Sequence, residues 1–336
     1  MKQVMQKKTR RRTIRRVIGI LSGALLLYCA LSMLASAIVF CVLFPRSSGE
    51  SPLYYTFDEL SPDVPCESFS FPSGGNTLYG RRYDVSDPKG LIVVVSGVRA
   101  GKDTHLPEIV AFVKASWSVA TWDATGIGAS EGRGTIGLNQ IGEDLAAFMA
   151  YRASSDAWDG LPVVLYGHSA GAYAAAAALP DQSEIKAAVC ISGFDRPVTL
   201  MYGHARDRVG VLADLQYPFL YLESFFLFGA DANDSAREAI DAVTTPVLIV
   251  GGDSDDLVPY ANSLIRDPEQ YRNPNVRALL ITSAYRNEHS TPWLSPGAAR
   301  YRAELTDEES ADKALANELD PAFTEMILSF FEEALQ

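Results

Sequence analysis

The stretch "VLYGHSAGAYAAAAAL", residues 164–179, decides the fold class. It begins with an apolar run that ends in glycine, and it continues as an alanine-rich segment that stops at Pro180. The first part predicts a buried strand and the second part predicts a helix. Between them, residues 167–171 match the pattern G-x-S-x-G, in which a serine occupies a tight strand-to-helix turn. Ser169 is therefore a candidate nucleophile.

Residues 67–336 alternate between short apolar runs and amphipathic segments. Runs such as "LIVVVSG", which ends at Gly97, are typical of strands buried on both faces of a sheet. This alternation predicts an α/β protein with a mostly parallel twisted sheet and helices on both faces. Active sites of such sheets lie at the carboxyl ends of the strands. Further strands are expected at 77–85, 117–123, 162–167, 185–193, 246–252 and 276–282, and helices at 105–115, 138–153, 172–179 and 321–335.

The interval 194–245 interrupts this alternation. Compact domains rarely contain a structureless loop of that length, so we expect a small helical insertion, a short lid over the sheet edge. Its aromatic side chains either line an apolar substrate pocket or fix the insertion to the main domain. These residues are Tyr202, Tyr217, Phe219, Tyr221, Phe225, Phe226 and Phe228.

The first 44 residues have the pattern of a signal anchor. Residues 1–16 form a basic tail with eight Lys and Arg and no acidic residue, and residues 17–44 contain no charged side chain. At about 1.5 Å per residue, a helix over 17–44 is long enough to cross a bilayer core of about 30 Å. The basic flank predicts a single-pass protein of the cell membrane, with a cytoplasmic N-terminus and an extracytoplasmic domain at 67–336.

A cleaved signal peptide is the alternative for this segment, and it would make the protein secreted. The triplet Ala35-Ser36-Ala37 fits a cleavage site. However, the apolar run is longer than the usual core of a signal peptide, about 7–15 residues, which favours the anchor. Residues 45–66 follow with four prolines and are predicted to be a stalk.

Charge and cysteine usage restrict the partners of the domain. Eight of the 29 Lys and Arg residues lie in residues 1–16, whereas all 41 Asp and Glu residues lie beyond them. An acidic domain argues against nucleic acid or anionic lipid as a partner. A disulfide between Cys66 and Cys190 is permitted in an oxidising compartment, although Cys190 lies in an apolar run that reads as a buried strand. No His and Cys spacing indicates a metal site, and no cofactor is expected.

A serine nucleophile needs a histidine base and an acid that orients it. His289 follows the last predicted strand, in the loop "SAYRNEHSTPW", where the chain order Ser, Asp, His places the base. His168 lies inside the turn and is interpreted as structural, His105 begins a helix, and His204 lies in the insertion. The loop "GGDSDDLVPY" offers three acids, which are Asp253, Asp255 and Asp256.

This series of motifs resembles the α/β-hydrolase family over residues 67–335, and most of all its membrane-anchored or secreted serine hydrolases with a short lid. In that family the acid commonly lies in a G-x-x-D-x-x-V-P loop. Gly252, Asp255, Val258 and Pro259 match that loop, so the resemblance favours Asp255. Asp253 and Asp256 are the weaker candidates.

The resemblance also implies an oxyanion hole formed by two backbone N–H groups. One belongs to the residue after the nucleophile, Ala170, and the other to the loop after an early strand, where we assign Val98. Family members often have His-Gly in that loop, whereas this chain has Ser96 before Gly97. The stretch "WDATGIGASEG" is similar to a glycine-rich turn of the family, with Thr125 at the usual arginine position, and is interpreted as structural.

These residues predict a serine hydrolase in which Ser169, His289 and Asp255 act as the triad. We expect a carboxylic ester substrate with a small or lipid-like acyl group, cleaved through an acyl-enzyme. A peptidase, an amidase or an acyltransferase with the same triad is an alternative. A second alternative is a binding module at the cell surface that has the fold without catalysis.

Overall fold

One sheet of eight strands organises the part of the chain beyond residue 65. The structure is a computed structural model that describes residues 2–336, with the backbone alone for residues 2–9. The strand order is β1-β2-β4-β3-β5-β6-β7-β8. The pairs β1–β2 and β2–β4 are antiparallel, and all the other pairs are parallel. The mostly parallel sheet predicted from the sequence is confirmed. The strands are β1 Cys66–Ser73, β2 Asn76–Tyr83, β3 Leu91–Val95, β4 Ser118–Trp122, β5 Val163–His168, β6 Ile185–Ile191, β7 Val247–Gly252 and β8 Val276–Ile281.

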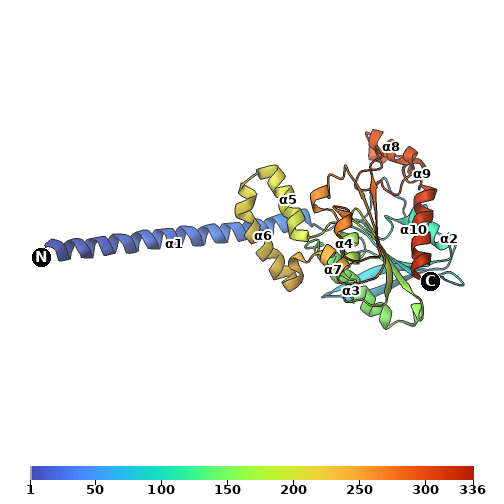
Figure 1. Cartoon of the computed structure of the whole chain (residues 1–336), viewed down its shortest axis with the longest axis horizontal. Coiled ribbons are helices and arrows are strands. Elements are labelled where there is room, and N and C mark those ends of the chain that lie inside the picture. The colour runs from blue at the N-terminus through green and yellow to red at the C-terminus, as the bar shows by residue number, and fades with distance from the viewer. Residues whose placement is uncertain (1) are drawn as a thin grey trace.

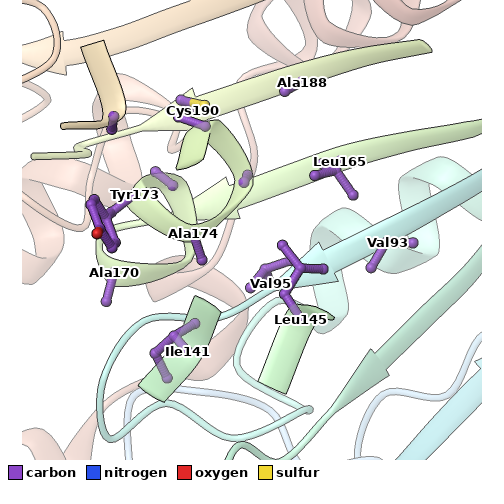
Figure 2. Close-up of a cluster of buried hydrophobic side chains, with 14 of the residues drawn as sticks. Val93, Val95, Ile141, Leu145, Leu165, Ala170, Tyr173, Ala174, Ala188 and Cys190 are labelled. Carbon is purple, nitrogen blue, oxygen red and sulfur yellow. The ribbon is translucent and has the colours of Figure 1, made fainter. Parts of the chain in front are cut away.

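Helices cover both faces of the sheet. Every residue of β3, β4 and β5 is buried, as expected for apolar strands between two helical layers. On one face, Val95 and Leu165 pack towards Leu145 of α3 and Ala174 of α4 (Figure 2). On the other face, α2, α8 and α10 pack in a second apolar cluster. The ten helices of residues 2–336 are α1 Lys2–Leu43, α2 Leu106–Lys114, α3 Gln140–Ala153, α4 Ala170–Ala177, α5 Pro197–Val209, α6 Leu212–Phe228, α7 Ala236–Asp241, α8 Pro296–Glu304, α9 Lys313–Ala316 and α10 Pro321–Ala334.

The long helix α1 projects from the domain (Figure 1). Its section from Arg10 to Leu43 is long and apolar enough to cross a membrane. The last part of α1 lies against α6, and Phe40 and Phe44 are buried there with Val198, Met201 and Leu220. The interval 194–245 holds α5, α6 and α7, so the helical character predicted for the insertion is confirmed.

The prediction of a stalk at residues 45–66 is wrong, because this segment lies along the domain. Ser47 pairs with Ile127 in a β-bridge, and Gly49 accepts a backbone hydrogen bond from Gly101. Glu59 forms an ion pair of 2.7 Å with Lys313. The prolines prevent a regular helix or strand here, but they do not hold the chain away from the domain. Apolar side chains of the segment pack on the second cluster, namely those of Tyr55, Phe57, Leu60 and Val64.

Cys66 and Cys190 are free thiols, so the disulfide that the sequence permitted is not formed. Cys190 is fully buried in β6, and burial raises the pKa of its thiol to about 12. A thiol with so high a pKa is a small apolar core residue rather than a nucleophile.

The close contact of α4 with the end of β3 depends on a glycine. A Cβ at Gly171 would collide with the Val95 carbonyl oxygen. The small side chains of α4 similarly allow the helix to lie close to the sheet, and all of α4 up to Ala176 is buried. The G-x-S-x-G turn is therefore fixed by backbone packing on both sides.

Gly171→Ala is expected to lower the free energy of unfolding by about 1–3 kcal/mol, because the backbone at Val95 must move to admit the methyl group. Gly142→Ala is the matched control, since Gly142 lies inside α3 with open space around its Cβ position, and it should gain about 0.5–1 kcal/mol. Urea unfolding followed by tryptophan fluorescence measures both. Equal unfolding midpoints for the two variants would contradict the packing argument.

Candidate active site

Ser169 lies in a strained turn between β5 and α4. Its φ of 58° and ψ of −121° are rarely adopted by residues other than glycine. Its backbone N–H donates to the Ile191 carbonyl oxygen at 2.9 Å, which ties the turn to β6. Gly97 lies so close that a Cβ there would be 2.9 Å from the Ser169 Cβ. This conformation directs the Ser169 side chain into a cavity at the carboxyl end of the sheet.

His289 and Asp255 meet in the loops that follow β8 and β7. His289 Nδ1 lies 2.8 Å from Asp255 Oδ2. The other carboxylate oxygen accepts the backbone N–H groups of Leu257 at 2.9 Å and Val258 at 2.7 Å. The Asp255 side chain is 3% exposed and the His289 side chain 11%. Asp255 is thus held as a buried carboxylate that orients the imidazole ring.

The structure does not bring the other two acids of this loop to the histidine. Asp253 is exposed, and its Oδ1 accepts a hydrogen bond from the Asn287 side-chain amide at 2.5 Å. Asp256 is exposed as well. Asp255 stands two residues before Leu257 and three before Val258. A carboxylate at this spacing can accept hydrogen bonds from both backbone N–H groups.

Ser169 and His289 line one cavity of about 970 Å³. No hydrogen bond joins the two side chains in the part of the chain that the structure describes, and such bonds often tighten only with substrate. Most of the cavity wall is apolar, with Phe194, Leu200 and Met201 among its residues. The aromatic residues of the insertion were predicted either to line the pocket or to fix the insertion. None of those seven side chains lines this cavity, while Tyr217 packs against the cluster that joins the insertion to α1.

His168 supports the loop of His289 rather than acting as the base. It donates from Nε2 to the His289 carbonyl oxygen at 3.0 Å, and the Ser192 hydroxyl donates to the same oxygen at 2.9 Å. Full burial, together with the nearby rings of His289 and His105, holds the pKa of His168 well below its usual value. The ring is therefore neutral, in the tautomer that carries a proton on Nε2.

The other two histidines are also placed away from the base position. His105 lies 2.9 Å from Glu108 in a buried pair at the start of α2. His204 of α5 contacts the Leu257 carbonyl oxygen at 2.9 Å through its Nε2. Ser192 was missed by the sequence analysis. Its position directly after β6, at the carboxyl edge of the sheet, was the available signal.

Two backbone N–H groups are the candidates for an oxyanion hole. Ala170 is the first residue of α4, so its N–H has no partner within the helix, and the helix dipole favours negative charge there. Val98 follows β3 and lines the cavity together with Ser169. Over the described residues, neither N–H donates to another protein group.

The stretch "WDATGIGASEG" has a structural role, as the sequence analysis proposed. The Asp123 carboxylate accepts hydrogen bonds from the Lys102 ammonium group at 2.6 Å and from the Ala129 N–H at 3.0 Å. Thr125, which stands at the arginine position of the family pattern, donates to Asp144 through its N–H and its hydroxyl. Burial raises the pKa of Asp144 above its usual value, and these hydrogen bonds offset only part of the rise. Among residues 2–336 no group of three or more His, Cys, Asp and Glu side chains is arranged to hold a metal ion.

Comparison with known proteins agrees with this fold. Residues 86–217 match the family described as serine aminopeptidase, S33. The search of curated proteins found no match. Among solved structures, the esterase Pf2001 of Pyrococcus furiosus has a TM-score of 0.60 at 17% identity, over 87% of this chain and 99% of that chain. TT1662 of Thermus thermophilus has a TM-score of 0.53 at 18% identity, over 81% and 98%. Est1E of Butyrivibrio proteoclasticus, solved with ferulic acid bound, has a TM-score of 0.52 at 17% identity, over 79% and 99%.

The sheet and the serine turn give this chain the α/β-hydrolase fold, which these solved structures share and which the resemblance of its motifs implied. The match of residues 86–217 to a serine aminopeptidase family supports a serine hydrolase.

The neutral state of His168 has a consequence for stability. Because its pKa in the folded chain lies below the usual value of about 6.5, the unfolded chain binds the proton first as the pH falls. The stabilisation is complete above about pH 6.5 and is lost as the pH falls towards the folded pKa. We expect the melting temperature to fall between about pH 7 and pH 5, and to fall less in His168→Gln, whose amide can still donate to the His289 carbonyl oxygen. Calorimetry in detergent micelles measures this, and parallel pH curves for the two proteins would refute it.

Proposed function

We propose that the chain hydrolyses carboxylic esters, with Ser169 as nucleophile, His289 as base and Asp255 as the acid that orients it. The observation that carries the proposal is the buried contact of His289 Nδ1 with Asp255, beside a strained serine that lines the same cavity. A carboxylate is expensive to bury, and beside an imidazole at the edge of a cavity it supports the imidazolium that forms during turnover.

The proposed reaction has two halves. His289 Nε2 accepts the proton of Ser169 as the Oγ attacks the ester carbonyl carbon, and the N–H groups of Ala170 and Val98 bind the oxyanion. The alcohol leaves with the proton from His289, so that an acyl-enzyme remains. A water molecule, deprotonated by His289, then attacks the acyl carbon, and His289 returns the proton to the Ser169 Oγ as the bond to the acyl group breaks and the carboxylic acid leaves. Asp255 fixes the tautomer of His289 and stabilises its cationic form.

An ester with an apolar acyl group fits the cavity better than a peptide does. A peptidase that binds the free α-ammonium group of a peptide needs a carboxylate in its site. The cavity wall contains one carboxylate, that of Glu50. Glu50 is itself exposed, and Arg99 and Arg208 also line the cavity, so the site offers no dominant negative charge. The peptidase and acyltransferase alternatives share the triad and differ from the esterase in the group that is transferred.

We further propose that α1 anchors the protein to the cell membrane, with residues 1–16 cytoplasmic and the domain extracytoplasmic. The contacts of α6 support an anchor that is retained. Gln216 donates to the Ser32 carbonyl oxygen at 2.7 Å and to the Ser36 hydroxyl at 2.8 Å. Cleavage after the triplet 35–37, the alternative for a secreted form, would remove both partners.

The purified protein is expected to hydrolyse p-nitrophenyl esters of medium acyl chains faster than p-nitroanilides of amino acids, because the cavity wall is mostly apolar. Ser169→Ala should abolish this turnover and also the covalent labelling of the protein by a fluorophosphonate probe. Faster anilide cleavage would favour the peptidase. A folded wild type that neither turns over nor becomes labelled would favour the binding module.

Asp255→Asn is expected to lower kcat on an activated ester by a factor on the order of 10⁴, since the amide no longer holds His289 in the productive tautomer. Asp253→Asn is the control from the same loop, and its kcat should stay within about twofold because its carboxylate is exposed and does not contact His289. Stopped-flow release of p-nitrophenol measures both. The reverse order of the two variants would rule out Asp255 as the acid.

A further inference from the structure

The helices α5 and α6 expose a large apolar surface. Phe226 is 69% exposed and Val211 is 72% exposed. Contiguous apolar patches of this kind mark interaction sites on soluble domains. We call this set the hairpin surface, and its members are Val209, Val211, Leu212, Leu215, Tyr221, Leu222, Phe225, Phe226 and Leu227.

The hairpin surface is continuous with the exposed side of α1. The Tyr28 hydroxyl donates to the Leu215 carbonyl oxygen at 2.8 Å, and the Tyr28 ring packs edge-on against Phe219 at 5.5 Å between centroids. Gln216 binds Ser32 and Ser36, as described above. The polar groups of Tyr28, Gln216, Ser32 and Ser36 at this junction are therefore paired with one another or with backbone.

The position of the junction along α1 sets its depth in a bilayer. Arg16 is the last cation before the apolar run. At about 1.5 Å per residue, Ser32 lies about 24 Å and Ser36 about 30 Å beyond Arg16 along the helix. The hydrocarbon core is about 30 Å thick, so α6 contacts α1 at the level of the far leaflet if Arg16 lies at the near edge. A hairpin held at this level meets lipid and not water.

The catalytic cavity reaches the same region. Val39 and Leu43 of α1 and the following Phe44 line the cavity that contains Ser169, and so does Val209 of the hairpin surface. Val209 is also 53% exposed. The cavity thus connects the nucleophile with the apolar surface beside α1.

We propose that the hairpin surface lies in the outer leaflet beside α1, and that the substrate is a membrane lipid whose acyl ester passes from that leaflet into the cavity. The substrate class rests on the proposed esterase function, whereas the bilayer contact rests on the proposed anchor. Apolar and aromatic side chains on a surface helix bind the boundary between headgroups and acyl chains, with a strength that scales with buried apolar area. A bilayer also accounts for apolar side chains that would otherwise face water on two adjoining elements.

The contact is tested with the full chain in phosphatidylcholine vesicles that contain brominated acyl chains. The four native tryptophans are Trp117, Trp122, Trp158 and Trp293, all of which are buried, so an added tryptophan can be measured as a difference. Phe226→Trp should gain emission that brominated lipid quenches by about half or more. Leu315→Trp is the matched control, because Leu315 is 54% exposed and lies on α9, far from α6 (Figure 1). Brominated lipid should not change the emission of this added tryptophan.

Equal quenching of the two added tryptophans would overturn the proposal. A Phe226→Trp signal that is shielded from brominated lipid and depends on protein concentration would also overturn it, since a second copy of the chain would then cover the hairpin surface.

Kinetics separate the failure of this proposal from the failure of the esterase function. The double variant Phe225→Ser with Phe226→Ser should keep wild-type turnover of a short soluble ester, because neither side chain lines the cavity. Its turnover of a long-chain acyl ester presented in vesicles should fall about fivefold or more. No loss on vesicles would overturn the proposed lipid entry, while a wild type inactive on every ester would overturn the esterase function and leave the quenching result to decide the bilayer contact.

Discussion

The close approach of α4 to the end of β3 is the constraint on which the rest of the site depends. Gly171 brings the start of α4 against the Val95 carbonyl, and this contact sets the turn that strains Ser169. The same contact brings the loop after β3 beside the helix N-terminus, so that Val98 lines the cavity next to Ser169, the residue before α4. Neither Ser169 nor the two proposed oxyanion donors would keep their positions if the helix moved out by the width of a methyl group.

A second constraint acts on the base. The His289 loop has no regular structure, yet its carbonyl oxygen receives hydrogen bonds from both His168 and Ser192. Asp255 holds the ring from the other side. The loop is thus fixed at its backbone by the ends of β5 and β6 and at its side chain by the loop after β7, which is how an irregular segment provides a preorganised base.

The sheet and the serine turn could be predicted from the sequence because both are local patterns. Continuous apolar runs and the alanine-rich segment after residue 169 each report their own burial. The segment 45–66 shows where this reasoning fails. Its prolines indicate irregular backbone, but whether an irregular segment is free or packed depends on side chains such as Phe57 and Leu60, which find their partners far along the chain. The site divides in the same way. The loop motif favoured Asp255 as the acid. The choice between Asp255 and the two neighbouring aspartates needed the positions of His289 and Asn287 in the structure. The sequence indicated a structural role for His168, but its hydrogen bond to the His289 backbone could not be deduced, because the two residues lie 121 positions apart.

The end of α1 has a consequence for the biogenesis of the protein. Arg99, the residue after Val98, donates to the carbonyl oxygen of Leu43, the last residue of α1, at 3.0 Å. Phe40 and Phe44 complete the packing of Val198, Met201 and Leu220. The N-terminal helix is therefore part of the folded enzyme and not only a leader that addresses it. A chain from which this helix had been removed, for example by cleavage of a signal peptide, would lack one wall of its cavity and a partner for the loop of Val98.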